Sequence, residues 1–414
     1  MERFISVCGL AVFVAIAWAL SLDRRRFPWR TVAAGLGLQL AFAFLILRTT
    51  TGQALFRWLD RAVDKLLSFS DKGVAMVFGP LADKTLLSEK WGPDHGFIFV
   101  ITITGTIIIV SALSSLLYHY GVLQLVVRAL AWLMRKVMGT SGSESLAAAA
   151  NIFMGQTEAP LVVKPYLSRM TKSEIMALMV PGFASIAGGV LAAYVSFGID
   201  ATHLLTASIM SAPAALMMAK ILVPETEHSE TSGGATAEIE CESSNGIDAI
   251  CLGATEGMKL AINVMGMLIA FVALVALFNF MLSYGLRAVG IQNAAPLQTM
   301  LGWLNAPFAW VMGVPWKDCG IVGAVLGERI VLNEFVGYLS LAKAKETIEP
   351  HSFMIATYAL CGFANFASIA IQIGGVGALA PTRRADLASL GLRAMIGGLL
   401  SCYCTACIAS LLAR

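Results

Sequence analysis

The chain has 414 residues, of which 57% are hydrophobic and 13% charged, with a formal net charge of +3 and a mean hydropathy of +0.76. Because soluble proteins carry about 25% charged residues, this composition excludes an ordinary soluble domain, and the small net charge gives no basis for a nucleic-acid partner. Apolar runs near the length of about 20 residues that spans a membrane as a helix recur along the chain, and they are too continuous for barrel strands. We therefore predict an all-α polytopic membrane protein.

Eight apolar runs are predicted to cross the membrane. In chain order they cover residues 4–22, 31–47, 96–118, 175–199, 201–219, 260–286, 352–382 and 394–413. Four arginines in residues 23–30 follow the first run, and Arg383, Arg384 and Arg393 precede the last. The positive-inside rule places both basic loops in the cytoplasm, so the N-terminus and, after eight crossings, the C-terminus are expected outside. The first run is interpreted as a span because a basic start and a cleavage site are absent.

Two segments between the runs are more polar. Residues 53–71 mix large apolar side chains with charged ones, which favours an amphipathic helix in the membrane interface over a helix packed on a soluble loop. Residues 224–248 are acidic and rich in Ser, Thr and Gly. That composition predicts a flexible cytoplasmic loop joining two halves of the protein.

Two further apolar regions are interrupted by polar residues. The first runs through residues 145–155, meets Gln-Thr-Glu at 156–158, and continues briefly to residue 167. The second covers residues 297–341, where Asn-Glu at 333–334 breaks the apolar sequence. Each is predicted to be a re-entrant hairpin of two half-helices that meet at a polar tip, since irregular backbone is tolerated in a membrane only where it faces protein or water.

The pentapeptide Phe-Ala-Ser-Ile-Ala occurs at residues 183–187 and 366–370, each time after one of these hairpins and before a pair of glycines. Coincidence in an apolar chain explains the pentapeptide alone. It does not explain the repeated order of hairpin, carboxylate, hydroxyl, glycines and a final span. Counted along the spans, the two units begin on opposite sides of the membrane. We therefore predict an inverted repeat, whose interrupted segments indicate a transporter binding site near the midplane.

Glu158 and Glu334 are the carboxylates at the two hairpin tips. A carboxylate at membrane depth is costly without partners or water, so both are candidate functional residues. The alternative is a structural ion pair, for which Lys164 and Arg329 are the nearest bases in sequence. The uncharged polar residues nearby suit a neutral substrate rich in hydroxyl and amide groups: Asn151, Gln156, Thr157, Ser185, Asn333, Asn365 and Ser368. Unwound carbonyls beside Asn and Ser also suit sodium, a hard cation.

Motifs of other functional classes are absent from the sequence. It has no Walker A motif, so uphill transport would depend on an ion gradient, and it has no zinc-protease or serine-hydrolase signature. An intramembrane enzyme that uses Glu158 and Glu334 as an acid–base pair remains a rival hypothesis, as does an uncoupled channel. Three cysteines cluster in the last run, at Cys402, Cys404 and Cys407, and small apolar packing is favoured over a metal site because no second pair exists.

Three motifs resemble those of the concentrative nucleoside transporter family. Residues 151–160, Asn-Ile-Phe-Met-Gly-Gln-Thr-Glu-Ala-Pro, resemble its first-hairpin signature, and residues 333–336, Asn-Glu-Phe-Val, resemble the second. Residues 361–369, Cys-Gly-Phe-Ala-Asn-Phe-Ala-Ser-Ile, resemble the span that follows. The resemblance covers essentially the whole chain in its bacterial eight-span form and implies sodium-coupled import of nucleosides such as uridine. It also implies a homotrimer in the bacterial inner membrane, with a transport domain that moves like an elevator against a scaffold of the third and sixth spans.

The resemblance also implies roles for individual residues. Those that would read the base or form its apolar walls are Gln156, Thr157, Glu158, Val190 and Leu260. Those that would hold the ribose hydroxyls or line the pocket are Glu334, Phe363, Asn365 and Ser368. Those that would bind sodium are Asn151 and Ser185, through side chains, and Met154 and Ile186, through nearby carbonyls. Proton-coupled members tend to lose the Asn and Ser of this ion site; both remain here, so sodium coupling is favoured over proton coupling.

The expected organisation has six parts. They are the N-terminal spans and interfacial helix at 1–94, a scaffold span and interfacial helix at 95–142, the first repeat at 143–223, the flexible loop at 224–248, a second scaffold span at 249–296, and the second repeat at 297–414.

Overall fold

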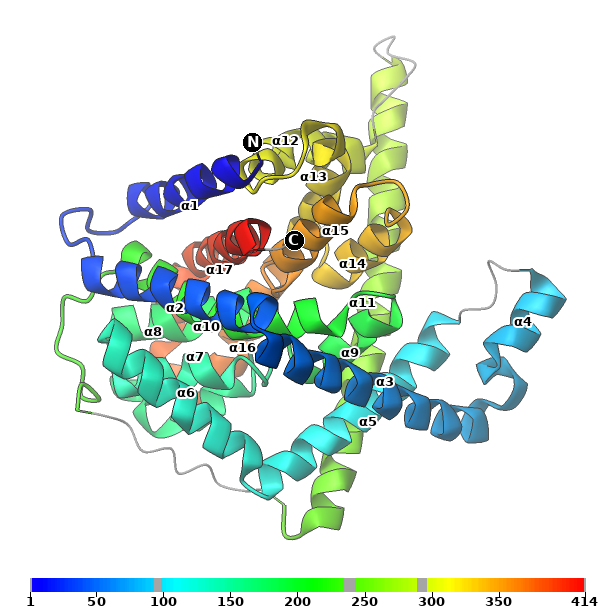
Figure 1. Cartoon of the computed structure of the whole chain (residues 1–414), viewed down its shortest axis with the longest axis horizontal. Helices are drawn as coiled ribbons and strands as arrows, with labels where there is room; N and C mark the ends of the chain where they lie inside the picture. The colour runs from blue at the N-terminus through cyan, green and yellow to red at the C-terminus, as the bar shows by residue number, and fades with distance from the viewer. Residues whose placement is uncertain (1, 93–97, 234–242, 289–295, 413–414) are drawn as a thin grey trace.

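The computed structural model describes residues 2–92, 98–233, 243–288 and 296–412 (Figure 1). Every regular element in these ranges is a helix, which confirms the all-α fold. Parts of several predictions lie outside the described residues: positions 96–97 of the third run, 234–242 of the loop, 289–295 of the second scaffold segment, and the last residue of the eighth run.

The first half of the chain forms α1 (Glu2–Ala19), α2 (Trp29–Arg48), α3 (Thr50–Phe78), η1 (Gly79–Ala82), α4 (Lys84–Trp91), α5 (Phe99–His119), α6 (Val122–Met138), α7 (Gly142–Ala150), η3 (Ala159–Arg169), α8 (Lys172–Ala184), α9 (Gly188–Ser196) and α10 (Ala201–Leu222). The second half forms α11 (Gly246–Ala288), α12 (Leu297–Val311), α13 (Trp316–Val331), α14 (Glu334–Lys343), α15 (Pro350–Leu360), α16 (Phe366–Leu379), η4 (Pro381–Arg383) and α17 (Arg384–Leu412).

Each of the eight predicted runs becomes helical. Among the described residues, six helical segments are long and apolar enough to cross a membrane, namely Trp29–Arg48, Val100–His119, Lys172–Ser196, Ala201–Leu222, Gly246–Arg287 and Pro381–Leu412. Two shorter apolar helices are Arg3–Ala19 and Phe366–Leu379. Two of the runs differ from a simple span, because the helix is interrupted between α8 and α9 and again between α15 and α16. The first interruption, residues 185–187, falls within the first Phe-Ala-Ser-Ile-Ala copy, whereas the second, residues 361–365, ends just before the second copy, which begins α16.

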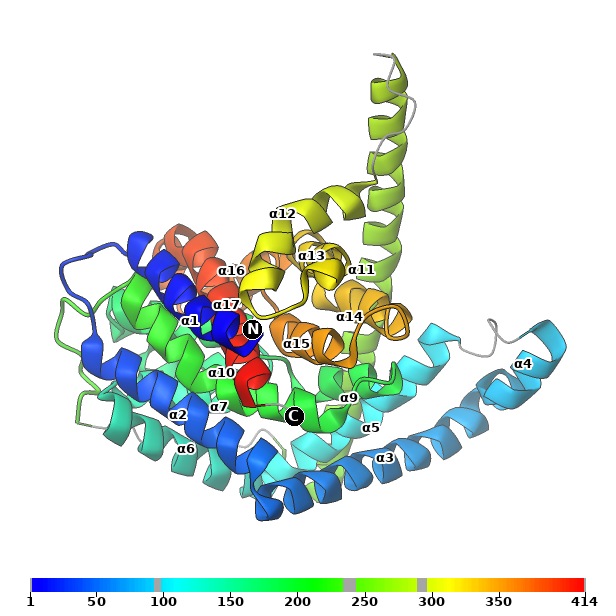
Figure 2. The same ribbon diagram turned by 45° about the horizontal axis from the view of Figure 1, so that its top comes forward.

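The membrane helices form an inner and an outer group (Figures 1 and 2). More than four fifths of the apolar stretch is buried inside the protein in the segments of α8–α9, α10 and α17. The buried share of the apolar stretch is one third in α2 and α5 and 12% in α11. The inner helices α8, α10, α15 and α17 pack on one another, whereas α11 pairs with α5 along the outside. Figure 2 shows α11 projecting well beyond the rest of the molecule. Apolar faces that the chain leaves uncovered on α11 are typical of a helix in contact with lipid or another subunit.

Local sequence fixes where the key helices begin. Ser141 and Glu144 form a reciprocal capping box at the start of α7, and Thr171 and Glu174 form another at the start of α8. At the hairpin tip and helix break of the second repeat, Asn side chains accept from backbone N–H groups of α14 and α16. The asparagines therefore start the helices that follow each break, in addition to any role in binding.

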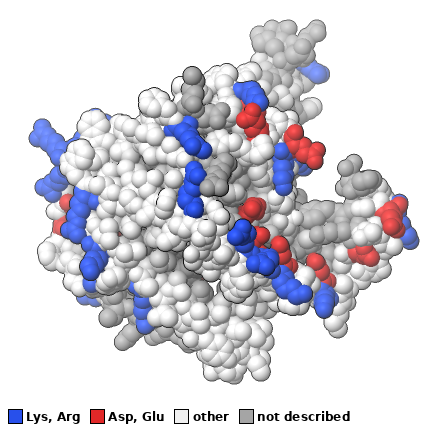
Figure 3. Space-filling view, viewed as in Figure 1, with Lys and Arg blue, Asp and Glu red and all other residues white. Residues whose placement is uncertain are grey.

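The two ends of the described chain lie on one side of the molecule. The hydroxyl groups of Ser6 in α1 and Ser410 in α17 are 2.9 Å apart. At the other end of these helices, Leu22 N donates to Leu222 O across 2.9 Å, and Arg393 Nε donates to Leu20 O across 3.4 Å. The two arginine-rich loops are thus neighbours, as expected if both face the same compartment. Figure 3 shows Lys and Arg at this rim, mixed charges along α3, and a largely uncharged face between them.

Candidate functional site

The candidate site begins where the two broken helices cross. Phe363 N, after the end of α15, donates to Ser185 O, after the end of α8, across 3.3 Å. The crossing depends on glycine, because a Cβ on Gly362 would lie 2.5 Å from Phe183 O. A Cβ on Gly398 of α17 would lie 2.4 Å from Phe183 Cβ. The second repeat can therefore approach the first only because these two positions lack a side chain.

Cys402 of α17 occupies the same crossing. Its thiol donates to Cys361 O across 3.3 Å and reaches Ala184 O at 3.7 Å, so it satisfies carbonyls freed by both helix breaks. A free cysteine is small and has a weak donor, which suits this tight position. The sequence analysis could not assign this role, because the contact joins residues that are distant in the chain.

The tip of the first hairpin packs against α16 of the second repeat. Gln156 Nε2 donates to Ser368 Oγ across 3.2 Å, and both side chains are buried. Thr157 lies against Gly375, since a Cβ on this glycine would be 3.0 Å from Thr157 Cγ2. The structure thus brings together residues that the sequence analysis assigned to base and ribose recognition.

Glu334 is held at the tip of the second hairpin by side chains from both repeats. Asn365 Nδ2 donates to its Oε2 across 3.0 Å, and Tyr194 OH of α9 donates to its Oε1 across 3.3 Å. Glu334 is only 4% exposed. The sequence analysis missed Tyr194, although a tyrosine within an apolar half-helix next to a predicted site was an available signal.

Glu158 is arranged differently, because its side chain is exposed at the end of the first hairpin. Its Oε2 accepts from Gly155 N across 3.1 Å. In the described ranges neither Glu158 nor Glu334 takes part in an ion pair, while the buried Arg329 donates to Ala359 O and lies over the Tyr403 ring. Among the described residues, neither glutamate thus forms the structural ion pair that was the alternative to a functional role.

The residues expected to bind sodium gather where the first hairpin meets the first helix break. Gly188 N donates to Phe153 O across 3.2 Å and joins the two segments. Asn151 is 1% exposed, its Nδ2 donates to Ala147 O, and its Oδ1 has no hydrogen-bond partner in the described part of the chain. Ser185 Oγ donates to Pro181 O across 2.8 Å and keeps its lone pairs. A buried oxygen without a donor partner fits a hard cation, which prefers oxygen ligands.

The remaining predicted residues lie around this centre. Val190 is 2% exposed in α9, and Ile186 is fully buried beside the helix break. Phe363 and Met154 are half-buried. Leu260 of the outer helix α11 approaches the start of α9, where a Cβ on Gly189 would be 4.0 Å from its Cδ2.

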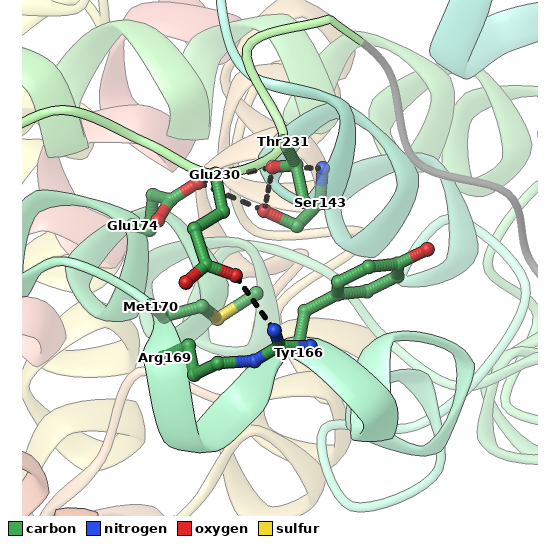
Figure 4. Close-up of a pocket in the computed structure, with 7 residues that line it drawn as sticks. All are labelled: Ser143, Tyr166, Arg169, Met170, Glu174, Glu230 and Thr231. Atoms are coloured by element: carbon green, nitrogen blue, oxygen red, sulfur yellow. Dashed lines mark hydrogen bonds and ion pairs between the residues drawn. The ribbon is translucent and has the colours of Figure 1, made fainter.

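A second polar cluster lies at the starts of α7 and α8 (Figure 4). Glu174 Oε1 accepts hydrogen bonds from four hydroxyls, those of Ser141, Ser143, Ser229 and Thr231. Nearby, Arg169 pairs with Glu230 at 3.0 Å, and Lys220 pairs with the buried Glu144. The space between Glu174, Thr231 and the Arg169–Glu230 pair holds no room for a water molecule, and the four hydroxyls already satisfy Glu174 Oε1, which favours a structural role for the cluster.

This cluster bears on the prediction that residues 224–248 form a flexible loop, of which residues 234–242 lie outside the described residues: the part before them packs against the starts of α7 and α8. Ser229 and Thr231 are 8% and 4% exposed, and Gly142 N donates to Thr231 O. The end of the segment is also ordered, because α11 begins at Gly246. The composition was misleading because hydroxyl-rich sequence was interpreted as solvated, whereas two of its hydroxyls bind a buried carboxylate.

Comparison with protein families gives three matches. The family profile described as "Na+ dependent nucleoside transporter C-terminus" matches residues 203–410, and its N-terminal counterpart matches residues 8–81. A profile described as "Nucleoside recognition" matches residues 100–201. Together these cover most of the chain.

Curated relatives extend over the full length of the chain. An uncharacterized transporter of Haemophilus influenzae is 43% identical over 99% of this chain and 98% of its own length. Solute carrier family 28 member 3 of Mus musculus is 40% identical over 99% of this chain, which spans 59% of that longer protein.

Solved structures of CNTnw have the same fold. Its inward-facing substrate-bound structure superposes with a TM-score of 0.93 at 40% identity, covering 100% of this chain and 98% of the other. Other CNTnw structures, described as outward-facing and intermediate, match with TM-scores of 0.92 to 0.94.

Proposed function

The chain belongs to the Na+-dependent nucleoside transporter family, and on that premise we propose that it imports nucleosides such as uridine together with sodium ions. It is a multi-pass membrane transporter and not an enzyme, so the acid–base rival is set aside. Sodium is the coupling ion that the family description specifies.

The observation that carries the proposal is the environment of Glu334. Its buried carboxylate, which forms no ion pair within the described part of the chain, is oriented by Asn365 and Tyr194 next to Ser368. Such a carboxylate is a strong acceptor for the paired hydroxyls of a ribose. We assign Glu334, Asn365 and Ser368 to the ribose, with Phe363 as a wall.

The base is assigned to the first hairpin. Gln156, Thr157 and Glu158 come from its tip and supply both donors and acceptors, and Val190 and Leu260 supply apolar surface. Site-specific polar groups around an apolar pocket are the usual composition of a small-molecule site. The sodium ion is assigned to Asn151 and Ser185 with carbonyls near Met154 and Ile186, and the unpartnered Asn151 Oδ1 supports this assignment.

We assign the transport domain to the two repeats, residues 143–223 and 297–414, and the scaffold to the segments at 95–142 and 249–296. The proposed transport mechanism is of the elevator type. It is supported by the tight packing of α8, α10, α15 and α17 into one unit and by the looser, outer position of α5 and α11. The inward-facing and outward-facing states of CNTnw support alternating access. A homotrimer in the bacterial inner membrane, with both termini outside, completes the proposal, and the exposed apolar surface of α11 supports an interface there.

The decisive experiment uses purified protein in liposomes with an imposed sodium gradient. Uridine should accumulate above its external concentration when sodium is present, and a proton gradient alone should not drive it. Uracil, which lacks the ribose, should be taken up far more poorly, because a site built to bond hydroxyls rejects analogues that lack them by large factors. Equal uptake of uracil and uridine, or uridine flux without accumulation, would contradict the proposal.

A further inference from the structure

Gln372 is a buried glutamine of α16 that none of the preceding assignments uses. It is 1% exposed and lies one helical turn beyond Ser368. Its Nε2 donates twice, to Met179 O of α8 and to Gln156 Oε1 of the first hairpin, each across 3.2 Å. It therefore touches the residue assigned to the base without itself being in that assignment.

The two bonds of Gln372 determine how its own amide is oriented. A backbone carbonyl such as Met179 O can only accept, so the nitrogen of the Gln372 amide must face it. The other N–H of the same nitrogen then points at Gln156. The Oε1 atom of Gln372 has no partner among the residues described, and turning the amide over would place this oxygen, which cannot donate, against the two acceptors Met179 O and Gln156 Oε1.

The orientation of Gln156 follows from that of Gln372. Because Gln156 Oε1 accepts from Gln372, its nitrogen faces Ser368 Oγ and donates to it across 3.2 Å. A primary amide has two N–H donors, so one donor of Gln156 remains for a ligand. Its oxygen, in contrast, is already engaged by a fixed donor.

Gly182 of α8 provides the space for this arrangement. A Cβ at this position would lie 2.6 Å from Gln372 Nε2 and 3.1 Å from Gln156 Cβ. The two amides are therefore packed against bare helix backbone, where Gln372 can reach the carbonyl of Met179.

We propose that Gln372 is a positioning residue that sets base specificity by fixing Gln156 as a hydrogen-bond donor toward the nucleobase. This inference rests on the proposed function. It predicts that the site prefers a base with a carbonyl oxygen facing Gln156, as in uridine, over a base with an amino group there, as in cytidine. Without Gln372 the Gln156 amide can turn and present either its donor or its acceptor.

The test compares Gln372→Met with the wild type in sodium-driven uptake by proteoliposomes. Met retains the volume and lacks the donors. The KM for uridine relative to that for cytidine should rise about 3- to 10-fold, the effect of one hydrogen bond of ordinary strength, while the ratio between uridine and 2′-deoxyuridine changes less than about twofold. Gln39→Met is the matched control, since Gln39 is a fully buried glutamine of α2 whose amide, within the described ranges, donates to Gly35 O of its own helix.

A second variant guards against simple loss of folding. Gly182→Ala removes no polar group but displaces the amides, and it should shift the uridine-to-cytidine ratio in the same direction. An unchanged ratio in variants that still transport would overturn the inference. Loss of uptake of every nucleoside in both variants, with Gln39→Met intact, would also overturn it by making Gln372 merely structural. Failure of the wild type to accumulate any nucleoside would instead contradict the proposed function.

Discussion

Gln156 and Ser368 are 212 positions apart in the chain, yet the amide of one donates to the hydroxyl of the other across 3.2 Å. The contact joins the first hairpin to the broken helix of the second repeat. From Ser368 the connection continues through Asn365, which caps α16, to the carboxylate of Glu334. Residues assigned to the two ends of a nucleoside are therefore linked by direct hydrogen bonds within one packed unit, so they can move together during transport.

Replacing Glu334 by Gln should abolish most uptake at low uridine concentration. A hydrogen bond to a charged group contributes about 1.5–3 kcal/mol, so the KM for uridine should rise about 10- to 150-fold. The measurement is sodium-driven uptake as a function of uridine concentration. Glu328→Gln is the control, because Glu328 is a second buried glutamate of the same hairpin, while Asn365 and Tyr194 donate to Glu334. Comparable losses in both variants would argue against the ribose assignment.

Replacing Ser185 by Ala should weaken the binding of sodium without altering the maximal rate of uridine transport. The half-saturating sodium concentration should rise by about tenfold or more, since even residues outside the ligand shell contribute about 10- to 100-fold to metal affinity. Ser196→Ala is matched to it, because the hydroxyl of Ser196 likewise donates to the carbonyl four residues earlier. Sodium activation curves that coincide for the two variants would exclude Ser185 as a ligand.

The sequence predicted much of this fold because membrane helices are long and apolar. Hairpins were visible where Gln, Asn and Glu interrupt apolar sequence, and the repeat was visible in the order of its parts. The roles of Tyr194, Gln372 and Cys402 were not predicted, because they depend on contacts across more than 100 positions of the chain. Helices buried on all sides carry no amphipathic pattern that would single out such residues.

The order of residues 224–233 was also unpredictable from composition. A hydroxyl-rich acidic segment is solvated in most proteins, and only the buried Glu174 on a distant helix explains why this one is not. The candidate site was predicted most fully where one short motif carried several residues, as at the first hairpin.

Replacing Lys220 by Met should destabilise the protein strongly. Its partner Glu144 is 1% exposed, and removing one member of a buried pair costs about 3–5 kcal/mol because the other charge is left uncompensated. Lys259→Met removes an exposed partner of Glu256 and should cost no more than about 1 kcal/mol. Thermal unfolding in detergent compares them. Adding Glu144→Gln to Lys220→Met should restore part of the loss, and a double variant less stable than Lys220→Met would refute the explanation.

Replacement by alanine should have different effects on uridine transport at the two adjacent glycines of the second repeat. A Cβ on Gly375 would be 3.0 Å from Thr157 Cγ2, whereas a Cβ on Gly374 meets no atom within 4 Å. Gly375→Ala should push the first hairpin away from α16 and raise the KM for uridine by about 3-fold or more, the equivalent of one weakened hydrogen bond. Gly374→Ala should leave the KM unchanged and stabilise α16 by up to about 1 kcal/mol, the difference in helix propensity between the two residues. Uptake kinetics and thermal unfolding are measured for both variants. Because the two substitutions are one position apart in one helix, any difference between them reports the contact with Thr157 and not a general effect of adding a methyl group. Equal KM values for the two would mean that the hairpin does not depend on close approach at Gly375.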